Sequence, residues 1–467
     1  MVDISRRVTL GAAGLGALGV GASWPRLTGA DIPGRHDDAL TVAILGTAQD
    51  AEARAGLLDA FRAQHPDIPV RLLAVQGQDW TQFFTKILTM VAAGTPPDVC
   101  LVATEGAQLF AERLAAPLDD YVRRDAAEMQ DYFSDVHPAL VDAFMYRGSL
   151  FQLPIDFNAA NMYYNSAALE RAGLQRPADD WSTDDFLVVA REMRRAGGPG
   201  FRPFFWTNRL WGGVVPWLYV NGTSFLSEEK ATGGRWLWDS FYADDPAAAG
   251  RDGGTLWLRP NALDPAVEET FEWLRELTAE GLGSSPAAGG GNELVARFAE
   301  GVIGMTPAGG FWAQGLSEGG MGPDDFDVSF FPRGRTQRHQ FGSAGYAILE
   351  TSQRKDEAWE WVKFCTSVEG MKLSIPTPNT TPVRRSLVND AFYASTGPRH
   401  WSVFYDTLDR FSDTAPIPAP PQQAAVETAL IKNVLGAVTA PPGGVRPALE
   451  LLQRDLTLAL RTDTTRS

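Results

Sequence analysis

The segment Gly148–Asn165, GSLFQLPIDFNAANMYYN, decides the fold expected for this chain. It begins with a polar turn that leads into apolar Leu150 and Phe151. Pro154 follows and cannot donate a hydrogen bond to a sheet ladder. A second apolar run then ends at Tyr163–Asn165. This pattern is typical of a chain that leaves one sheet and enters another.

Two polar side chains, Asp156 and Asn158, lie just beyond Pro154. Helix-sized segments flank the whole stretch, so two α/β lobes would hinge at this point. Polar side chains at such a crossing would face the gap between the lobes. The sequence therefore predicts a ligand site between two lobes.

Length and composition describe an ordinary folded protein. The 467 residues exceed what one hydrophobic core usually serves and predict two or three domains. Apolar residues make up 44% and charged residues 21%, which excludes a disordered chain. The net charge of −16 argues against nucleic acid or an anionic membrane surface as partner. The 14 tryptophans fill a core or stack on sugar faces.

Residues 1–30 are interpreted as a cleavable export signal. Ser5–Arg7 carries paired arginines, and the Gly/Ala-rich run Val8–Ala22 is too short and too weakly apolar to span a membrane. The pair resembles a twin-arginine signal, although Thr9 and Gly11 depart from its usual pattern and leave Sec export open. We expect a periplasmic or extracellular protein.

Cysteine usage agrees with this picture. Cys100 and Cys365 are the two cysteines of the chain, so there is no disulfide framework, and whether they pair stays open. Neither lies at the end of the signal, so no lipid-anchor cysteine is expected.

Strand and helix patterns alternate through the first part of the chain. Apolar runs at 39–45, 70–75 and 99–103 predict strands, and the spacing at 51–64 and 80–93 predicts helices. Alternation of this kind favours a mainly parallel sheet with ligands beyond the carboxyl ends of its strands. Further helices are predicted at 167–172, 183–195, 266–280, 355–367 and 422–460, further strands at 302–306, 328–331 and 341–349, and a loop or hairpin insertion at 233–258.

Several short motifs carry a family resemblance that covers nearly the whole chain. They are Ala92–Val99 (AAGTPPDV), Leu114–Tyr121 (LAAPLDDY), Leu153–Pro154 with Tyr164–Asn165, Ala172–Leu174, Phe298–Gly301 with Gly304–Met305, and Thr381–Pro382 with Arg384. Together they resemble the family 1 extracellular solute-binding proteins of ABC importers.

The resemblance implies a two-lobed α/β periplasmic-binding-protein fold with three hinge crossings. By matching positions, the crossings are expected near 154–158, 302–306 and 342–346. The first lobe is expected at 38–155 and 303–343, and the second at 156–302 and 344–467. The lobes would close over a carbohydrate or polyol, which the protein would deliver to the permease subunits of an ABC transporter. A monomer without cofactor or metal is expected.

The candidate ligand-binding residues come from this resemblance and from aromatic and polar patterns. They are Gln49, Asp50, Trp80, Glu105, Asp156, Asn158, Trp206, Trp211, Gly310, Phe311, Trp312, Gly345, Tyr346 and Arg384. In the resemblance, Trp312 matches the aromatic that stacks on sugar, and Arg384 matches a basic position that Arg385 could also take. Carboxylates, amides and rings are the groups that recognise sugar hydroxyls and C–H faces.

Simpler roles stay open for several of these residues. Asp50 could cap a helix, Glu105 could be a solvated loop residue, and Trp80 could anchor its helix in a core. Val102 stands where relatives that bind linear oligosaccharides often have Trp, which weakens the case for a long stacked ligand.

Two other functions remain as alternatives. One is an ABC binding protein for a charged solute such as glycerol phosphate, a polyamine or a uronate. The other is a lyase or hydrolase in which Glu105 and Asp156 meet across the gap. The five histidines show no metal-ligand spacing, and the chain is not expected to be an enzyme.

Overall fold

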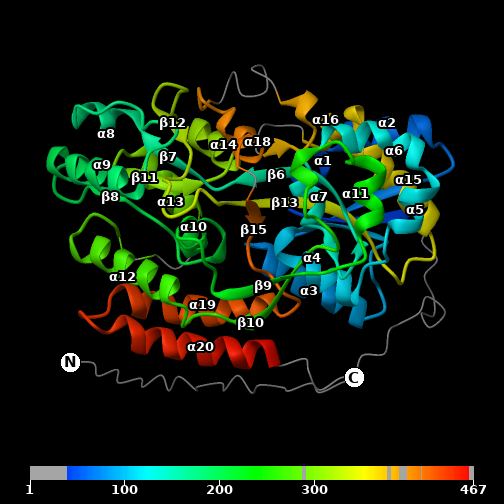
Figure 1. The fold of residues 1–467 in the computed structure, drawn as a ribbon. Coiled ribbons are helices and arrows are strands. Elements are labelled where there is room, and N and C mark those ends of the chain that lie inside the picture. Colours follow the sequence, from blue (N-terminus) through cyan, green and yellow to red (C-terminus); the bar gives the residue numbers. More distant parts are fainter. Residues whose placement is uncertain are drawn as a thin grey trace, which may run out of the picture.

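Two mixed sheets, each with its own helices, form the two lobes of the protein (Figure 1). The computed structural model describes residues 39–284, 286, 291–375, 380–388, 397–411 and 413–461. The predicted export signal lies outside these residues.

The first lobe is built on a seven-stranded sheet in the order β14-β6-β13-β3-β1-β2, with β15 paired to β13. Its strands are β1 (Leu40–Leu45), β2 (Val70–Val75), β3 (Val99–Ala103), β6 (Leu153–Ala159), β13 (His339–Ile348), β14 (Thr381–Pro382) and β15 (Thr414–Pro416). The helices packed on it are α1 (Ala48–Glu52), α2 (Ala55–Gln64), α3 (Trp80–Ala92), α4 (Thr104–Arg113), α5 (Asp119–Arg124), α6 (Ala126–Asp135), α7 (Pro138–Asp142), α15 (Lys355–Thr366) and α16 (Val368–Ser374). A small hairpin, β4 (Met145–Tyr146) with β5 (Ser149–Leu150), precedes β6.

The second lobe is built on a four-stranded sheet in the order β12-β7-β11-β8. Its strands are β7 (Asn161–Asn165), β8 (Arg202–Phe204), β11 (Ile303–Ala308) and β12 (Phe326–Ser329). Its helices are α8 (Ser166–Arg171), α9 (Thr183–Ala196), α10 (Val215–Val220), α12 (Pro265–Ala279), α13 (Gly291–Ala299), α14 (Phe311–Glu318), α18 (Val403–Arg410), α19 (Gln423–Val438) and α20 (Val445–Arg461).

The predicted elements are confirmed in type, while the sheets are mixed and not mainly parallel. β1 pairs parallel with β2 and β3, as the alternating pattern requires. β13 instead runs antiparallel to β3 and β6. The reason is that β6 leads out of the first lobe and β13 leads back into it, so the two strands run in opposite directions.

Two of the three expected crossings between the sheets lie elsewhere in the structure. The chain leaves β6 for β7 at residues 159–161, directly after the expected range 154–158. It returns through residues 330–338, between β12 and β13. The ranges 302–306 and 342–346 are not crossings, because the first lies in β11 of the second sheet and the second inside β13 of the first. The lobe boundaries expected at 303 and 344 differ from the structure for the same reason.

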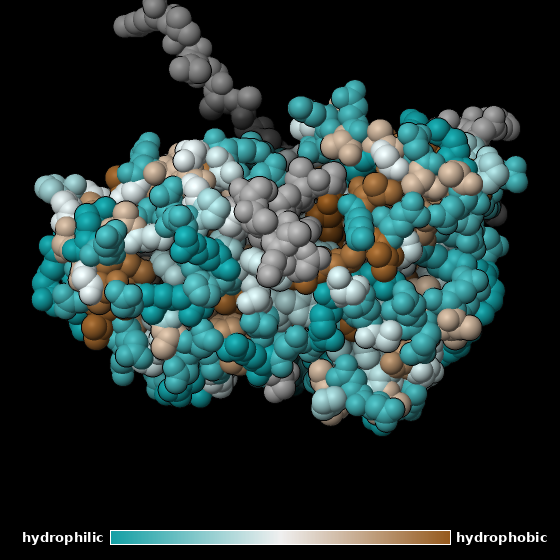
Figure 2. Space-filling view, turned by 90° about the horizontal axis from the view of Figure 1, so that it is seen from above, coloured by the Kyte–Doolittle hydropathy of each residue, from teal (hydrophilic) through white to brown (hydrophobic). Residues whose placement is uncertain are grey.

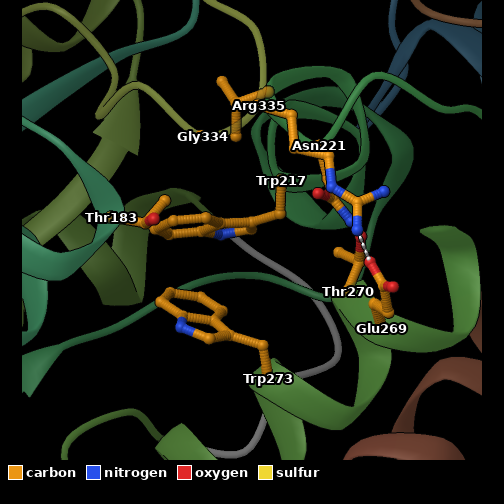
Figure 3. A pocket seen from close by; sticks show the side chains of 9 residues that line it. Thr183, Trp217, Asn221, Glu269, Thr270, Trp273, Gly334 and Arg335 are labelled. Carbon is orange, nitrogen blue, oxygen red and sulfur yellow. Dashed lines mark hydrogen bonds and ion pairs between the residues drawn. The ribbon is translucent and has the colours of Figure 1, made fainter.

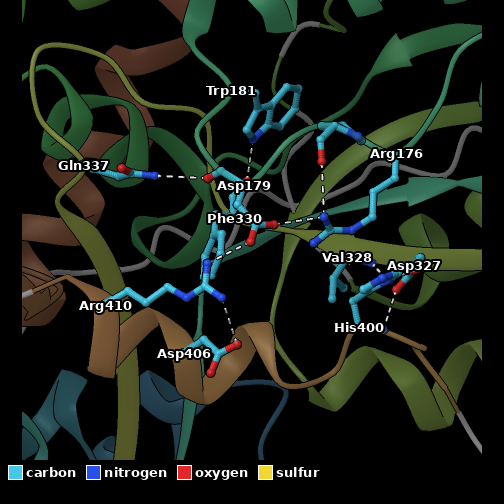
Figure 4. Close-up of polar contacts among 11 residues, drawn as sticks. Arg176, Asp179, Trp181, Asp327, Val328, Phe330, Gln337, His400, Asp406 and Arg410 are labelled. Carbon is cyan, nitrogen blue, oxygen red and sulfur yellow. Dashed lines mark hydrogen bonds and ion pairs between the residues drawn. The ribbon is translucent and has the colours of Figure 1, made fainter.

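A third passage joins β14 to α18, and α18 is held on the second lobe by ion pairs (Figure 4). Arg410 donates to Asp179 at 2.8 Å, and Arg176 approaches the same carboxylate at 2.9 Å. His400, just before α18, contacts the carboxylate of Asp327 on β12. These contacts anchor the returning chain on the second lobe.

The expected insertion at 233–258 forms an additional connection between the lobes. β9 (Leu226–Lys230) and β10 (Thr255–Pro260) make an antiparallel ribbon whose Trp257 is buried in the second-lobe core. Between them, α11 (Arg235–Phe241) lies among the helices of the first lobe (Figure 1). We call residues 231–254 the strap.

The strap is bound firmly to the first lobe. The rings of Phe241 and Phe133 lie 4.2 Å apart, and Trp236 donates its Nε1–H to Asp119 at 3.1 Å. Arg251 forms a buried ion pair with Asp142 at 2.8 Å. The insertion is therefore a tether between the lobes and not a free surface loop.

Candidate functional site

Strand β6 presents two polar side chains on one face. Asp156 and Asn158 are half-buried, while Phe157 between them points into the first-lobe core. Asp156 Oδ1 accepts a hydrogen bond from the Ala344 N–H at 3.0 Å, and Asn158 donates to Thr380 Oγ1 at 2.9 Å. Alternation along a strand therefore brings both predicted residues to the same surface.

Glu105 joins them from the end of β3, which β13 separates from β6 in the sheet. Helix α4 begins directly after β3, which places Glu105 in its first turn, where the helix dipole favours a carboxylate. Burial, together with the nearby carboxylates of Glu427 and Asp156, raises the pKa of Glu105 to about 7. Burial likewise raises the pKa of Asp156 to about 7, against the stabilising effect of the Ala344 N–H. Both groups are therefore partly protonated at neutral pH.

The second lobe contributes two aromatic rings. Trp211 lies in the irregular turn Leu210–Val214, where Gly212 adopts a left-handed conformation with φ 66°. The Gly212 N–H donates to the buried Gln340 Oε1 at 3.2 Å, which ties this turn to β13. The ring of Phe311, at the start of α14, lies 5.2 Å from that of Trp211, and Phe311 is 38% exposed.

The rings and the polar side chains meet at Gly342. In the register of β6 and β13, Gly342 stands opposite Asn158. A Cβ at Gly342 would lie 2.6 Å from Trp211 Nε1, and one at Gly309 would lie 2.7 Å from Asn158 Cβ. The two lobes thus touch here, with glycines where another side chain would force them apart. Seen from above, hydrophobic residues gather near the middle of the molecule (Figure 2).

Charged side chains of the two lobes also interact near Glu105. Burial lowers the pKa of Arg209, while the charges of Glu427, Asp79 and Glu105 oppose that shift. Glu427 on α19 accepts a hydrogen bond from Thr81 on α3 at 2.9 Å. We call Glu105, Asp156, Asn158, Trp211 and Phe311, with these surrounding charges, the interlobe site.

Four predicted residues lie outside it, in cores. Trp206 is 1% exposed and donates to Ser284 O, and Tyr346 is fully buried beside Trp361 in the first-lobe core. Trp312 is 4% exposed and packs against Tyr163 in the core of the second lobe. Neighbouring helical residues point about 100° apart. Phe311, and not Trp312, therefore faces Trp211.

Arg384 is the fourth of these buried residues. It is 2% exposed, and its guanidinium pairs with Asp131 at 3.0 Å and Asp135 at 3.3 Å. The neighbouring Arg385 pairs with Asp409 at 2.6 Å. Arg384 therefore holds α6 in place and is not a cleft-facing base.

The remaining predicted residues are exposed, anchor a helix, or are glycines with a role in backbone packing. Gln49 and Asp50 are exposed, and Asp50 closes a capping box with Thr47, which lowers the pKa of Asp50. Trp80 is half-buried and stacks on Phe84, as expected for an anchor of its helix. Gly310 caps α14, and Gly345 allows β6 to pack closely, since its Cβ would lie 2.7 Å from Leu153 O.

Sequence reasoning missed Arg209, Gln340, Gly342 and Glu427. A glycine inside a strand pattern often marks close approach of another group, so Gly342 had a usable signal. Arg209, Gln340 and Glu427 carried none, because charged and amide side chains are ordinarily solvated, whether on a loop, a strand or a helix.

The described residues hold no cluster of His, Cys, Asp and Glu suited to a metal ion. Cys100 and Cys365 are both buried free thiols, so they do not pair.

Comparison with known proteins assigns the family. The family model for bacterial extracellular solute-binding proteins matches residues 46–372. This chain belongs to that family. The solute-binding protein is also 23% identical, over 320 residues, to a lactose-binding protein of Rhizobium radiobacter. That alignment covers 65% of this chain and 64% of the relative, so the chain matches somewhat less than two thirds of the relative's length.

Solved structures share the fold. An ABC substrate-binding protein from Listeria monocytogenes in complex with cycloalternan has a TM-score of 0.69 at 18% identity, covering 90% of this chain and 98% of that one. The sugar-binding protein MalE from Xanthomonas citri has a TM-score of 0.68 at 18% identity, covering 90% and 97%. Maltose-bound MalE3 from T. maritima has a TM-score of 0.66 at 18% identity, covering 90% and 99%. The two-lobed fold of the solute-binding protein is therefore the one these proteins have.

Membership in an extracellular family implies that this solute-binding protein is exported. Among the helices that the structure describes, none is long and apolar enough to cross a membrane.

Proposed function

We propose that this solute-binding protein is the carbohydrate receptor of an ABC importer and binds its ligand at the interlobe site. One observation carries the proposal. The second lobe places Trp211 and Phe311 against the strand pair of the first lobe that bears Asp156 and Asn158. Rings on one wall and polar groups on the other are what a sugar requires, with its apolar C–H faces and its hydroxyls.

The state of the carboxyl groups supports a neutral ligand. Because the pKa values of Glu105 and Asp156 are both raised to about 7, each can accept a hydrogen bond from a hydroxyl when ionised, or donate one to a hydroxyl oxygen when neutral. Asn158 Oδ1 is buried and has no hydrogen-bond partner among the described residues, which leaves a further acceptor.

Ligand binding is expected to stabilise the closed arrangement of lobes, because both walls touch the ligand only there. The permease subunits would recognise that arrangement. The protein is expected to act as a monomer and to release its ligand chemically unchanged. The relatives described above bind lactose, cycloalternan and maltose, which favours a mono- or oligosaccharide.

A cationic solute such as a polyamine is the second candidate. The carboxylates of Glu427, Asp79 and Glu105 surround one half-buried arginine, Arg209, and Asp156 lies close to Glu105. If ligand binding ionised Glu105 and Asp156, the site would carry excess negative charge and favour a cation.

Calorimetric titration of the purified protein separates these cases. Lactose, maltose, maltotriose, spermidine, glycerol 3-phosphate and glucuronate would be compared, with the ligand analysed afterwards for turnover. We expect a saccharide to bind and to be recovered intact. Trp211→Ala should weaken its binding at least about 10-fold, since it removes a stacking ring.

Trp236→Ala is the matched control, because this indole lies in the strap under Arg123 and away from Trp211. It should leave saccharide affinity unchanged. Binding of spermidine alone would replace the carbohydrate proposal by the second candidate. Consumption of the saccharide would show an enzyme instead of a receptor.

A further inference from the structure

The second lobe contains a separate pocket away from the interlobe site. It lies between the start of α9, helices α10 and α12, and the turn at residues 333–336 (Figure 3). Its volume is about 380 Å³, which falls within the range of small-molecule sites. We call it the outer pocket. None of the five residues that define the interlobe site lines it.

Two indole rings form the apolar part of the outer pocket. The ring centroids of Trp217 and Trp273 lie 4.6 Å apart at 41°, and Figure 3 shows one ring above the other. Trp217 is 2% exposed and is fixed by Phe186 and Phe331, whereas Trp273 is only half-buried. Trp273 therefore offers a rigid ring to a ligand without a change in the core.

Polar groups of both charges stand beside the rings. Glu269 on α12 and Arg335 in the turn form an ion pair, with 52% and 58% of their side chains exposed. Asn221 is fixed nearby by hydrogen bonds from its Nδ2 to Ala266 O at 2.9 Å and to Thr270 Oγ1 at 3.0 Å. A carboxylate accepts hydrogen bonds from hydroxyls and a guanidinium donates to them. The pair has no net charge, so it suits a neutral ligand with several hydroxyls.

The turn that closes the outer pocket is well ordered by its own contacts. A Cβ at Gly334 would lie 2.6 Å from Val220 O, so the turn lies directly on the end of α10. Thr336 donates through Oγ1 to Tyr219 O at 2.9 Å. The outer pocket is thus preformed, which lowers the entropic cost of binding.

We propose that the outer pocket is a second saccharide-binding site, in which a sugar ring stacks on Trp273 and its hydroxyls bind Glu269 and Arg335. An aromatic face beside paired acceptor and donor groups is the combination that recognises a neutral sugar. The proposal does not depend on what the interlobe site binds.

The indole N–H signals in NMR spectra of the full protein, labelled with ¹⁵N-tryptophan, report on the two sites separately. Trp273→Phe and Trp211→Phe assign the two signals. Maltotriose and lactose are the probes, with L-leucine and spermidine as comparison solutes. We expect the Trp273 signal to move and saturate with a midpoint of roughly 1–10 mM, as a small exposed site allows. The same movement should persist in Trp211→Ala.

Variants test which residues hold the sugar. Glu269→Ala combined with Arg335→Ala should raise the saccharide concentration at the midpoint of the Trp273 titration about 10-fold or more. The matched control, Glu229→Ala with Arg259→Ala, removes another exposed ion pair of this lobe and should change nothing. Loss of the Trp273 movement in Trp211→Ala would show that it is transmitted from the interlobe site, and would overturn the proposal. So would an unmoved signal with both sugars at about 100 mM, or movement with L-leucine or spermidine alone.

Discussion

Replacing Arg251 by methionine is expected to loosen the attachment of the strap to the first lobe. Arg251 and Asp142 lie 2.8 Å apart with 9% and 10% of their side chains exposed. The Arg251 Nε–H also donates to Ala247 O at 2.8 Å. Removing the arginine leaves the Asp142 carboxylate buried without its counter-charge, which costs about 3–5 kcal/mol. With an unfolding entropy of about 2.1 cal/mol/K per residue over a chain of this length, the melting temperature should fall by about 3–5 °C.

A double variant tests whether the unpaired Asp142 charge is the cause. Replacing both partners, by Arg251→Met and Asp142→Leu, should restore the free energy of unfolding to within about 1 kcal/mol, because no buried charge then remains. Arg259→Met is the control, since its pair with Glu229 is exposed and should be worth about 1 kcal/mol or less.

Urea unfolding and amide hydrogen exchange measure the effect. Exchange should rise across residues 231–254 in the single variant and return to normal in the double one. The explanation is wrong if Arg251→Met lowers the free energy of unfolding by less than about 1 kcal/mol. It is also wrong if the double variant loses as much as Arg251→Met and Asp142→Leu lose separately, added together.

Three further outcomes are expected. Gly342→Ala should weaken ligand binding about 10-fold or more, because its Cβ would lie 2.6 Å from Trp211 Nε1 and push the ring away; unchanged calorimetric affinity would contradict the site. Arg384→Ala should destabilise the protein in urea by about 2 kcal/mol while ligand affinity stays the same, since its buried guanidinium holds Thr366 O and Asp135; a specific loss of affinity would show that Arg384 belongs to the interlobe site. The pKa values of Glu105 and Asp156 are raised on folding, so the folded state binds more protons and stability should fall as pH rises from about 4 to 7, then level off. Glu105→Gln should flatten this slope in urea midpoints, and an unchanged slope would show that Glu105 does not titrate there.

The sequence indicated most of the elements and the family of this protein. Apolar runs of strand length and helical spacing predicted β1 to β3 and their helices, because these signals are local. The direction of β13 and the places of two crossings were not predictable in this way. Each depends on which sheet a strand joins, and β11 and β13 have similar apolar composition.

Side-chain chemistry at the site was partly readable from the sequence. Alternation along β6 placed Asp156 and Asn158 on one surface, and the strand end placed Glu105 beside it. Phe311 and Trp312 could not be told apart, because both are aromatic and adjacent, and the packing of α14 alone decides which of them faces solvent. Arg384 looked like a cleft base until the acids of α6 were in place around it.

By itself, the sequence determined the elements, the two-lobed family and the polar residues that follow particular strands, since these depend on neighbours along the chain. Only the tertiary structure decided that Trp211 lies over Gly342, that Glu427 reaches Thr81, and that the strap crosses to the first lobe. The physical reason is that each of these contacts joins residues far apart in the chain, and no local pattern encodes the distance between them.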